Sequence, residues 1–483
     1  MKKIILVSAL LSIFVCIGKC QTPPEKPNII FIIADDISQE DIGCYGNSHI
    51  KTPHIDAIAN EGLRFTHMYV TSSSCSPSRS SILTSRYPHN TGAAELSTEL
   101  PADLIYFPEL LRHVGYYTAL AGKWHEGKNT ARAYDTLLVD RVQNGEGGEE
   151  QWLELLRNRP KNKPFMFWLA AYDAHRTWSA DAAFEKVYRP EEVRVPPTLL
   201  DTKKTREDLA LYYNEISRLD AYVGEIRQEL KEQGILDNTI VIFMADNGRA
   251  FPGSKTRLLD RGTLEPFLIS WPHGIAHKGC SADALVSSID IAPTLLELAG
   301  VGPVTSFQGR SFSSLLNHPD EDFRTYIFTE HNWHDYEAYE RAVRTKDFLY
   351  IVNERSYLDN GGPLDVFNSA SAAVLRANRK ELNAYQADMF LRPRPREEFY
   401  DNRKDPLQQS NLIADKNYVQ QIDHLRSILK QWQKETGDDL PDNLTPDWYD
   451  RESGRPLPQK GIRKVMPGKS RDAIKINVNG PFE

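Results

Sequence analysis

The sequence has few cysteines and no excess of positive charge. Of its five cysteines, only Cys44, Cys75 and Cys280 lie beyond the first twenty residues. Three cysteines permit one disulfide at most, which excludes a disulfide-stabilised scaffold. The 58 Lys and Arg residues are outnumbered by 66 Asp and Glu residues, which gives a formal net charge of −8. This balance argues against a nucleic-acid partner, and any anionic substrate requires a local cationic pocket.

Extended hydrophobic segments are confined to the N-terminus. Two lysines precede an apolar run over residues 4–17, which is too short to span a bilayer and is typical of a secretory signal. We therefore expect residues 1–20 to be a signal peptide and the mature protein to be exported. Lipidation at Cys20 is the alternative, which would make the protein a surface lipoprotein held at a membrane, although Lys19 stands where such a site has a small residue.

Glycosylation sequons are scarce as well. Asn443-Leu444-Thr445 is the one Asn-x-Ser/Thr sequence, and Pro446 follows it. A secreted or lysosomal eukaryotic enzyme of this size usually carries several such sequons. We therefore expect a bacterial protein that is periplasmic or secreted.

Short, unbroken apolar segments alternate with segments of helical spacing. The apolar segments suit strands buried on both faces of a sheet, and the alternation predicts an α/β fold with a mostly parallel central sheet. From residue 325 the pattern changes to shorter strands followed by a helix over residues 417–437. We predict a catalytic α/β domain over residues 27–324 and a smaller C-terminal α+β subdomain over residues 325–483. The predicted central strands lie in residues 28–36, 116–125, 164–175, 238–248 and 265–272, and the helices in residues 107–115, 206–234 and 288–300.

Oxygen-bearing side chains follow two of the predicted strands. Asp35 and Asp36 end the first apolar run, and Asp246 and Asn247 end a later one. Ligands collect at the carboxyl ends of strands in such sheets, and carboxylate and amide oxygens select calcium or magnesium over softer metals. The alternative is that these residues are ordinary caps in loops.

A second set of residues is basic. Arg79 lies one helical turn after Cys75 if a helix begins near Pro77, and Lys123 and His125 point the same way if their segment is extended. Together with a helix start, such groups suit an anion with several oxygens. Taken singly, each could also be a solvated surface charge or a structural histidine. The set is Arg79, Lys123, His125, His175 and Lys255.

Cys75 does not suit the predicted metal site as long as its side chain remains a thiol. A nucleophilic cysteine needs a base and a lowered thiolate pKa, which Arg79 could help to supply. A thiolate is nevertheless a poor ligand beside a hard oxygen site. The oxygen-bearing set predicts a hard metal site, whereas the set around Cys75 predicts a thiolate, and these two predictions conflict if Cys75 stays a cysteine.

The stretch "CSPSR", Cys75–Arg79, resembles the Cys-x-Pro-Ser-Arg signature of the type I sulfatases. In that family, a formylglycine-generating or anaerobic sulfatase-maturating enzyme oxidises the cysteine to formylglycine. "NIIFIIADD", "GKWH", "ADNG" and "EEFYDNRKDPLQQSNL" resemble other motifs of the family in their usual order. The resemblance implies an alkaline-phosphatase-like sandwich. One departure is Ser85, where the family usually has glycine.

The resemblance also implies roles for the candidate residues. One calcium ion would be held by Asp35, Asp36, Asp246, Asn247 and the formylglycine made from Cys75. Arg79, Lys123 and Lys255 would stabilise charge on the sulfuryl oxygens while the hydrated aldehyde attacks sulfur. His175 would be the general acid, with Lys255 also flanking the leaving atom, and His125 would assist the release of sulfate.

Within the family, "YDAHRTW" and "LKQWQKETGD" look most like the heparan N-sulfatase branch, which includes bacterial enzymes that act on algal polysaccharides such as ulvan. We expect an exported enzyme that removes O-sulfate from a sulfated polysaccharide or its oligosaccharides, with glucosamine N-sulfate as the alternative. A phosphate or phosphonate ester hydrolase and, if Cys75 is unmodified, a non-catalytic glycan-binding protein are further alternatives. The candidates for gripping the sugar are Asp173, Arg176, His331 and His334.

Overall fold

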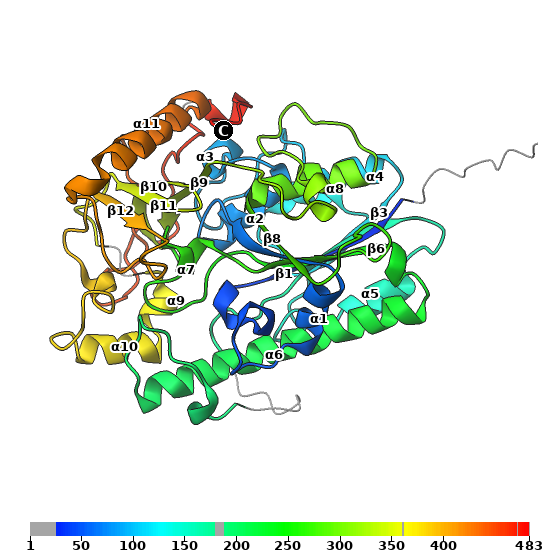
Figure 1. The fold of residues 1–483 in the computed structure, drawn as a ribbon, viewed down its shortest axis with the longest axis horizontal. Helices are drawn as coiled ribbons and strands as arrows, with labels where there is room; N and C mark the ends of the chain where they lie inside the picture. The colour runs from blue at the N-terminus through cyan, green and yellow to red at the C-terminus, as the bar shows by residue number, and fades with distance from the viewer. Residues whose placement is uncertain (1–25, 179–187, 360–361, 471, 483) are drawn as a thin grey trace, which may run out of the picture.

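Two β-sheets organise the part of the chain that the structure describes (Figure 1). The computed structural model describes residues 26–178, 188–359, 362–470 and 472–482, so the predicted signal peptide and the alternative lipidation at Cys20 lie outside the described residues. Within these ranges, no helix is both long and apolar enough to cross a membrane. Cys44, Cys75 and Cys280 are all free thiols.

The larger sheet, as far as the structure describes it, has eight strands in the order β4-β3-β5-β1-β6-β7-β2-β8. The central strand β1 pairs in parallel with β5 and β6, whereas the short strand β7 runs antiparallel to β6 and β2. The predicted mostly parallel sheet is therefore confirmed. The strands are β1 Asn28–Ala34, β2 Leu63–Tyr69, β3 Tyr117–Gly122, β4 Thr136–Leu138, β5 Phe165–Ala170, β6 Thr239–Ala245, β7 Phe267–Ser270 and β8 Cys280–Ser287.

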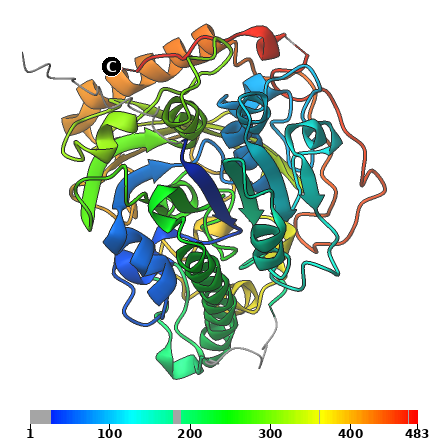
Figure 2. The same ribbon diagram turned by 90° about the vertical axis from the view of Figure 1, so that its right-hand side faces the viewer.

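Helices cover both faces of this sheet, as the two views show (Figures 1 and 2). Side chains alternate across β1, so Ile29, Phe31 and Ile33 pack against one helical layer, while Ile30 and Ile32 pack against the other. This two-sided burial explains the unbroken apolar run of β1. One layer contains α2 Cys75–Thr84, α4 Phe107–His113 and α8 Ile291–Leu298; the other contains α1 Pro53–Glu61, α5 Trp152–Asn158 and α6 Lys203–Glu232.

The second sheet is antiparallel, with the order β12-β11-β10-β9. Helix α11 packs on it through Ile422, Leu425, Leu429 and Trp432, whose spacing of three or four residues places them on one face. The predicted strands and helix are thus present, while the boundary between residues 324 and 325 stays a prediction. The elements are β9 Ile327–His334, β10 Tyr336–Arg344, β11 Phe348–Asn353, β12 Glu397–Asp401 and α11 Val419–Thr436, and the remaining short helices are α3 Pro88–Thr91, α7 Asp260–Thr263, α9 Leu364–Phe367 and α10 Ala370–Ala377.

A buried polar network joins the segment after α2 to the second sheet. His89 Nδ1 in α3 lies 2.9 Å from Glu330 Oε2 in β9. Arg341 in β10 donates to both oxygens of Asp438, at 2.6 and 2.7 Å. Burial raises the pKa of Asp438, but Arg341 and His89 outweigh it and bring the pKa to about 2. These contacts therefore hold the second sheet against α3, the short helix that follows α2, and against the end of α11.

We expect Asp438→Ala to lower the free energy of unfolding by about 3 kcal/mol, because it leaves the buried Arg341 guanidinium short of its main acceptor. Urea denaturation followed by circular dichroism measures the change. The neighbouring Asp439 is exposed, so Asp439→Ala is the matched control and should stay within about 0.5 kcal/mol of the wild type. Equal denaturation midpoints for the two variants would contradict the role of the network.

Candidate active site

The carboxyl ends of β1 and β6 bring two pairs of polar residues together. Ala34 is paired with Ala245 across the two parallel strands, so Asp35 and Asp36 emerge beside Asp246 and Asn247. The amide of Asp36 donates to Asp246 Oδ1 at 3.3 Å. Asp36 has a φ of +59°, a left-handed conformation that is uncommon for residues other than glycine. This turn directs consecutive carboxylates into the same space.

Cys75 lies against these carboxylates at the first position of α2. One ligand atom from each of Asp35, Asp36, Cys75 and Asp246 lies within 4.8 Å of the others, and all four residues are buried. Cys75 Sγ is 3.4 Å from Asp35 Oδ1. Burial and the charge of Asp35 raise the pKa of the thiol well above its ordinary value, against Lys123 and Lys255. An unmodified Cys75 is therefore a poor thiolate nucleophile.

The donor set fits a hard divalent cation. Asn247 donates its Nδ2 to Asp36 Oδ1 at 2.6 Å, while its buried Oδ1 has no hydrogen-bond partner among the described residues. Burial raises the pKa of Asp246 to about 6; Arg79 opposes this rise and Asp35 adds to it. Three crowded carboxylates and an orphaned amide oxygen are the ligands that calcium or magnesium prefers. The residues that could hold such an ion are Asp35, Asp36, Asp246 and Asn247.

Three cations surround the carboxylates, each from a different element. Arg79 in α2 donates its Nε to Asp246 Oδ2 at 2.6 Å, and Lys255 Nζ lies 2.8 Å from Asp36 Oδ2. Lys123, which follows β3, pairs with Asp35. Both terminal nitrogens of Arg79 are buried and lack partners among the described residues. Such orphaned donors suit an oxyanion with several oxygens.

Glycine places Lys123 in the site. Gly122 ends β3 with a φ of +100°, and a Cβ at this position would lie 2.0 Å from the carbonyl oxygen of Ala170 in β5. The amide of Lys123 then donates to the same oxygen at 2.8 Å. Only glycine fits this approach without strain, so the "GK" pair in "GKWH" has a geometric reason.

The two candidate histidines have different environments. Burial, Lys123 and Arg79 lower the pKa of His125 well below its ordinary value, so its ring is neutral, with Nε2 3.0 Å from Ser97 Oγ. His175 Nδ1 lies within hydrogen-bond distance of the Arg176 carbonyl oxygen. A carbonyl only accepts, so Nδ1 is the donor and Nε2 is free to exchange a proton. That Nε2 lies 3.9 Å from Asp36 Oδ2.

Asp365 in α9 also belongs to the site, although no sequence motif marks it. Its Oδ2 lies 2.9 Å from Lys255 Nζ and 3.7 Å from His175 Nε2. Burial raises the pKa of this carboxyl, but Lys255, His175 and His334 outweigh it and hold the pKa below the usual range. Asp365 is therefore an ionised carboxylate beside the groups that face a substrate.

The candidates for sugar binding lie close by, but the first two are held in internal ion pairs. Arg218 Nε donates to Asp173 Oδ2 at 2.7 Å. Arg176 donates to both oxygens of Asp208, at 2.8 and 2.9 Å. Their roles in binding sugar stay predictions.

His331 and His334 both lie in β9 and are buried. His334 Nδ1 is 2.8 Å from the hydroxyl of Ser74, which precedes Cys75, whereas His331 Nδ1 has no partner among the described residues. Burial, Arg257 and Arg341 lower the pKa of His331 to about 3, so this ring is neutral. Their roles in binding sugar also stay predictions.

Ser85, which stands where the resemblance leads us to expect glycine, ends α2 with a φ of +54°. Its hydroxyl donates to the Ile289 carbonyl at 2.6 Å and accepts from the amide of Gly309 at 3.2 Å. A left-handed backbone conformation at the end of a helix favours glycine, and the two hydrogen bonds explain how serine is held there. The departure from the family pattern thus leaves the shape of α2 intact.

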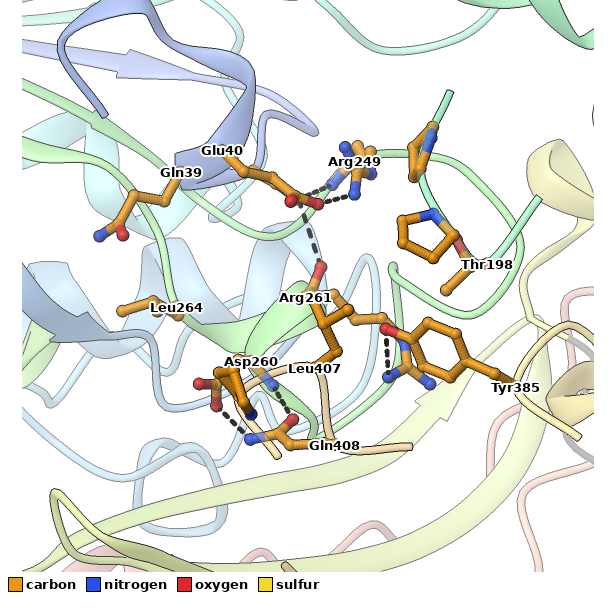
Figure 3. Close-up of a pocket in the computed structure, with 14 residues that line it drawn as sticks. Gln39, Glu40, Thr198, Arg249, Asp260, Arg261, Leu264, Tyr385, Leu407 and Gln408 are labelled. Atoms are coloured by element: carbon orange, nitrogen blue, oxygen red, sulfur yellow. Dashed lines mark hydrogen bonds and ion pairs between the residues drawn. The ribbon is translucent and has the colours of Figure 1, made fainter. Parts of the chain in front are cut away.

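A cavity of about 150 Å³ is lined in part by the loop that follows β6, through Arg249 (Figure 3). Arg249, Arg261 and Tyr385 line it, with Glu40 paired to Arg249. None of the predicted site residues lines this cavity. It is therefore separate from the cluster around Cys75.

The sequence is similar to known proteins along most of its length. The family model for Sulfatase matches residues 27–301, and that for N-sulphoglucosamine sulphohydrolase, C-terminal, matches residues 254–357. The chain is 30% identical to the N-sulphoglucosamine sulphohydrolase of Homo sapiens, over 89% of this chain and 94% of that protein. It is 28% identical to an ulvan-active sulfatase of Formosa agariphila, over 87% of this chain and 77% of that protein.

A solved structure supports the fold. A protein in complex with its substrate D-glucosamine-2-N,6-O-disulfate superposes with a TM-score of 0.66 at 22% identity, over 85% of this chain and 98% of that one. The region that matches the sulfatase family model, residues 27–301, spans more than half of the chain. It includes the whole cluster around Cys75, with the carboxylates of Asp35, Asp36 and Asp246 and the cations Arg79, Lys123 and Lys255. The chain belongs to the sulfatase family and is a sulfuric ester hydrolase.

Proposed function

We propose that this sulfatase removes O-sulfate from sugar units of an ulvan-type polysaccharide or its oligosaccharides after export from a bacterial cell. The observation that carries the proposal is the position of Cys75 between hard oxygen ligands and the unpartnered nitrogens of Arg79. The similarity to ulvan-active sulfatases and the N-terminal segment typical of a secretory signal support the substrate and the location. The periplasm and secretion are both compatible with such a signal.

Hydrolysis of N-sulfoglucosamine in heparan fragments is the second candidate. Two observations favour it: the 30% identity to the human N-sulphoglucosamine sulphohydrolase and the match of that protein's C-terminal family model to residues 254–357. The matched C-terminal region includes His331 and His334, two of the candidates for gripping the sugar.

Calcium and formylglycine both fit the residues of the site and would supply its reactive chemistry. Calcium bound by Asp35, Asp36, Asp246 and Asn247 would supply positive charge close to the sulfate oxygens. Formylglycine, made from Cys75 by a maturating enzyme, would supply an oxygen nucleophile where Sγ now lies. This replaces a buried thiol with a raised pKa by a group that matches the hard ligands around it.

The protein's own residues would bind the sulfate and move protons. The terminal nitrogens of Arg79, with Lys123 and Lys255, would donate to the sulfuryl oxygens and stabilise the charge that grows on them. The Arg176 carbonyl accepts its hydrogen bond from His175 Nδ1, so Nε2 of the same ring would be available to protonate the leaving atom. His125 is neutral and would accept a proton as sulfate is released.

We expect the peptide that contains Cys75 to carry an aldehyde in active enzyme, as measured by mass spectrometry. Cys44 and Cys280 serve as internal controls and should remain thiols. Cys75→Ala should keep the fold by circular dichroism and lose turnover, because the nucleophile is gone. An unmodified Cys75 in enzyme that still hydrolyses sulfate esters would contradict this role, whereas an unmodified Cys75 in inactive native protein that binds glycans would favour a binding function.

We expect one calcium ion per chain, measured by isothermal titration calorimetry on the Cys75→Ala variant. Saturating calcium should raise the melting temperature, because a ligand that binds only the folded state stabilises it. Asp246→Ala should weaken calcium binding at least tenfold, since it removes a carboxylate ligand. Asp283→Ala, which removes an exposed carboxylate of β8 outside the site, is the control. Calcium binding that is the same in both variants would refute the assigned ligands.

We expect sulfate release from defined ulvan oligosaccharides to exceed release from heparan oligosaccharides, as read by ion chromatography. The reverse order would establish the second candidate.

Matched aryl sulfate and aryl phosphate esters test the phosphatase alternative. We expect sulfate release to be faster, because both Cys75 and the cations around it fit the sulfatase family. Faster phosphate release would overturn the assignment of sulfate as the substrate.

A further inference from the structure

The carboxylate of Asp365 is held in one orientation at the site. Its Oδ1 accepts a hydrogen bond from the amide of Val366 at 2.8 Å. The amide of Leu364, at the start of α9, donates to Asp335 Oδ2 at 3.0 Å and thereby fixes the helix. The other oxygen, Oδ2, faces Lys255 and His175. The backbone thus presents a single carboxylate oxygen to the two groups expected to flank the leaving atom.

Exposure shows on which side the substrate lies. The side chains of Asp36 and Lys255 are 0% exposed, whereas those of Asp365 and His175 are 18% and 34% exposed. The site therefore opens past Asp365 and His175. The inner end of the site is closed by the carboxylate cluster, so the sugar that remains after sulfate is removed would lie against these two side chains.

The two side chains lie close enough together to contact neighbouring substituents of one sugar ring. His175 Nε2 and Asp365 Oδ2 are 3.7 Å apart. If the leaving atom lies within hydrogen-bond reach of His175 Nε2, a substituent on the next ring carbon lies within similar reach of Asp365 Oδ2. A carboxylate accepts hydrogen bonds but donates none, and it repels another anion.

We propose that Asp365 determines specificity by accepting a hydrogen bond from an uncharged hydroxyl or N–H group on the carbon next to the one that bears the scissile sulfate. Its charge excludes a second sulfate or a carboxylate from that carbon. This inference rests on the proposed function, because it takes a sugar as the leaving group. It narrows the substrate to sugars with a free donor beside the sulfate.

The test compares the wild type with Asp365→Asn on three methyl glycosides of the sugar that the oligosaccharide panel identifies. All three carry the same scissile sulfate, and the next carbon bears a hydroxyl, a hydrogen or a second sulfate. An aryl sulfate without a neighbouring substituent reports the basal chemistry, including any effect through Lys255. For each enzyme, kcat/KM on the glycosides is divided by kcat/KM on the aryl sulfate.

In the wild type, we expect the kcat/KM ratio for the hydroxyl glycoside to exceed that for the deoxy glycoside by roughly tenfold to a hundredfold. This is the effect of one hydrogen bond to a charged group. The doubly sulfated glycoside should be slower still. Asp365→Asn keeps the shape of the side chain and removes its charge, so the ratio of the hydroxyl to the doubly sulfated glycoside should fall at least tenfold. Asp365→Ala should give the same fall if the asparagine variant unfolds.

The matched control is Asp359→Asn, which removes a carboxylate of the same segment that pairs with Arg392 at 2.7 Å outside the site. Its ratios should equal those of the wild type. An Asp365→Asn variant that loses the same factor on all four substrates would overturn the proposal and limit Asp365 to positioning Lys255. A wild type that hydrolyses the aryl sulfate but releases no sulfate from any oligosaccharide of the panel would instead overturn the proposed function, and this inference with it.

Discussion

The active site depends on the mutual neutralisation of three buried carboxylates and three buried cations. Asp246 pairs with Arg79, Asp35 with Lys123 and Asp36 with Lys255. An isolated buried charge is strongly unfavourable, whereas each of these six charges has a partner of opposite sign inside the site. A divalent cation on the carboxylates would leave the three cationic side chains with a surplus of positive charge. In the proposed function, the same six residues pair with one another before the cation binds and would attract an oxyanion once it is bound.

The backbone makes this pairing possible because each partner comes from a different strand or helix. Adjacent parallel strands deliver the carboxylates of Asp36 and Asp246 to one edge of the sheet, and α2 delivers Cys75 and Arg79 from its first turn and a half. The left-handed Asp36 and Gly122 supply local turns that regular strands cannot make. The position of the charged groups is thus fixed by hydrogen-bonded backbone, which favours a preorganised site over one assembled by flexible side chains.

The parts of the fold that the sequence predicts are those with a strong local signal. The apolar run of β1 and the oxygen-bearing residues after it can be read directly, because burial on both faces and hard-ligand chemistry each restrict residue type. Polar Arg64, Thr66 and His67 interrupt β2, a half-buried strand beside the short β7, so no apolar run marks it. Asp365 leaves no signal because its contact with Lys255 joins residues 110 positions apart. The partner of Arg176, which the structure shows to be Asp208, likewise depends on tertiary packing.

The site is composite, and its two halves come from the two sheets. The first sheet and α2 supply the charged cluster around Cys75, and two rim residues border it: the buried His334 from β9 and the partly exposed Asp365 from α9. His334 is joined to Ser74, the residue before Cys75, and Asp365 to Lys255, so each rim residue is attached to the cluster that it borders. A substitution at the rim can therefore change which sugar fits without removing a sulfate-binding charge. Such a separation would be compatible with the similarity of this chain, over nearly nine-tenths of its length, to relatives named for N-sulphoglucosamine and for ulvan. In the proposed function, the cluster around Cys75 would carry the sulfate chemistry, and the choice of sugar would fall to bordering side chains such as Asp365.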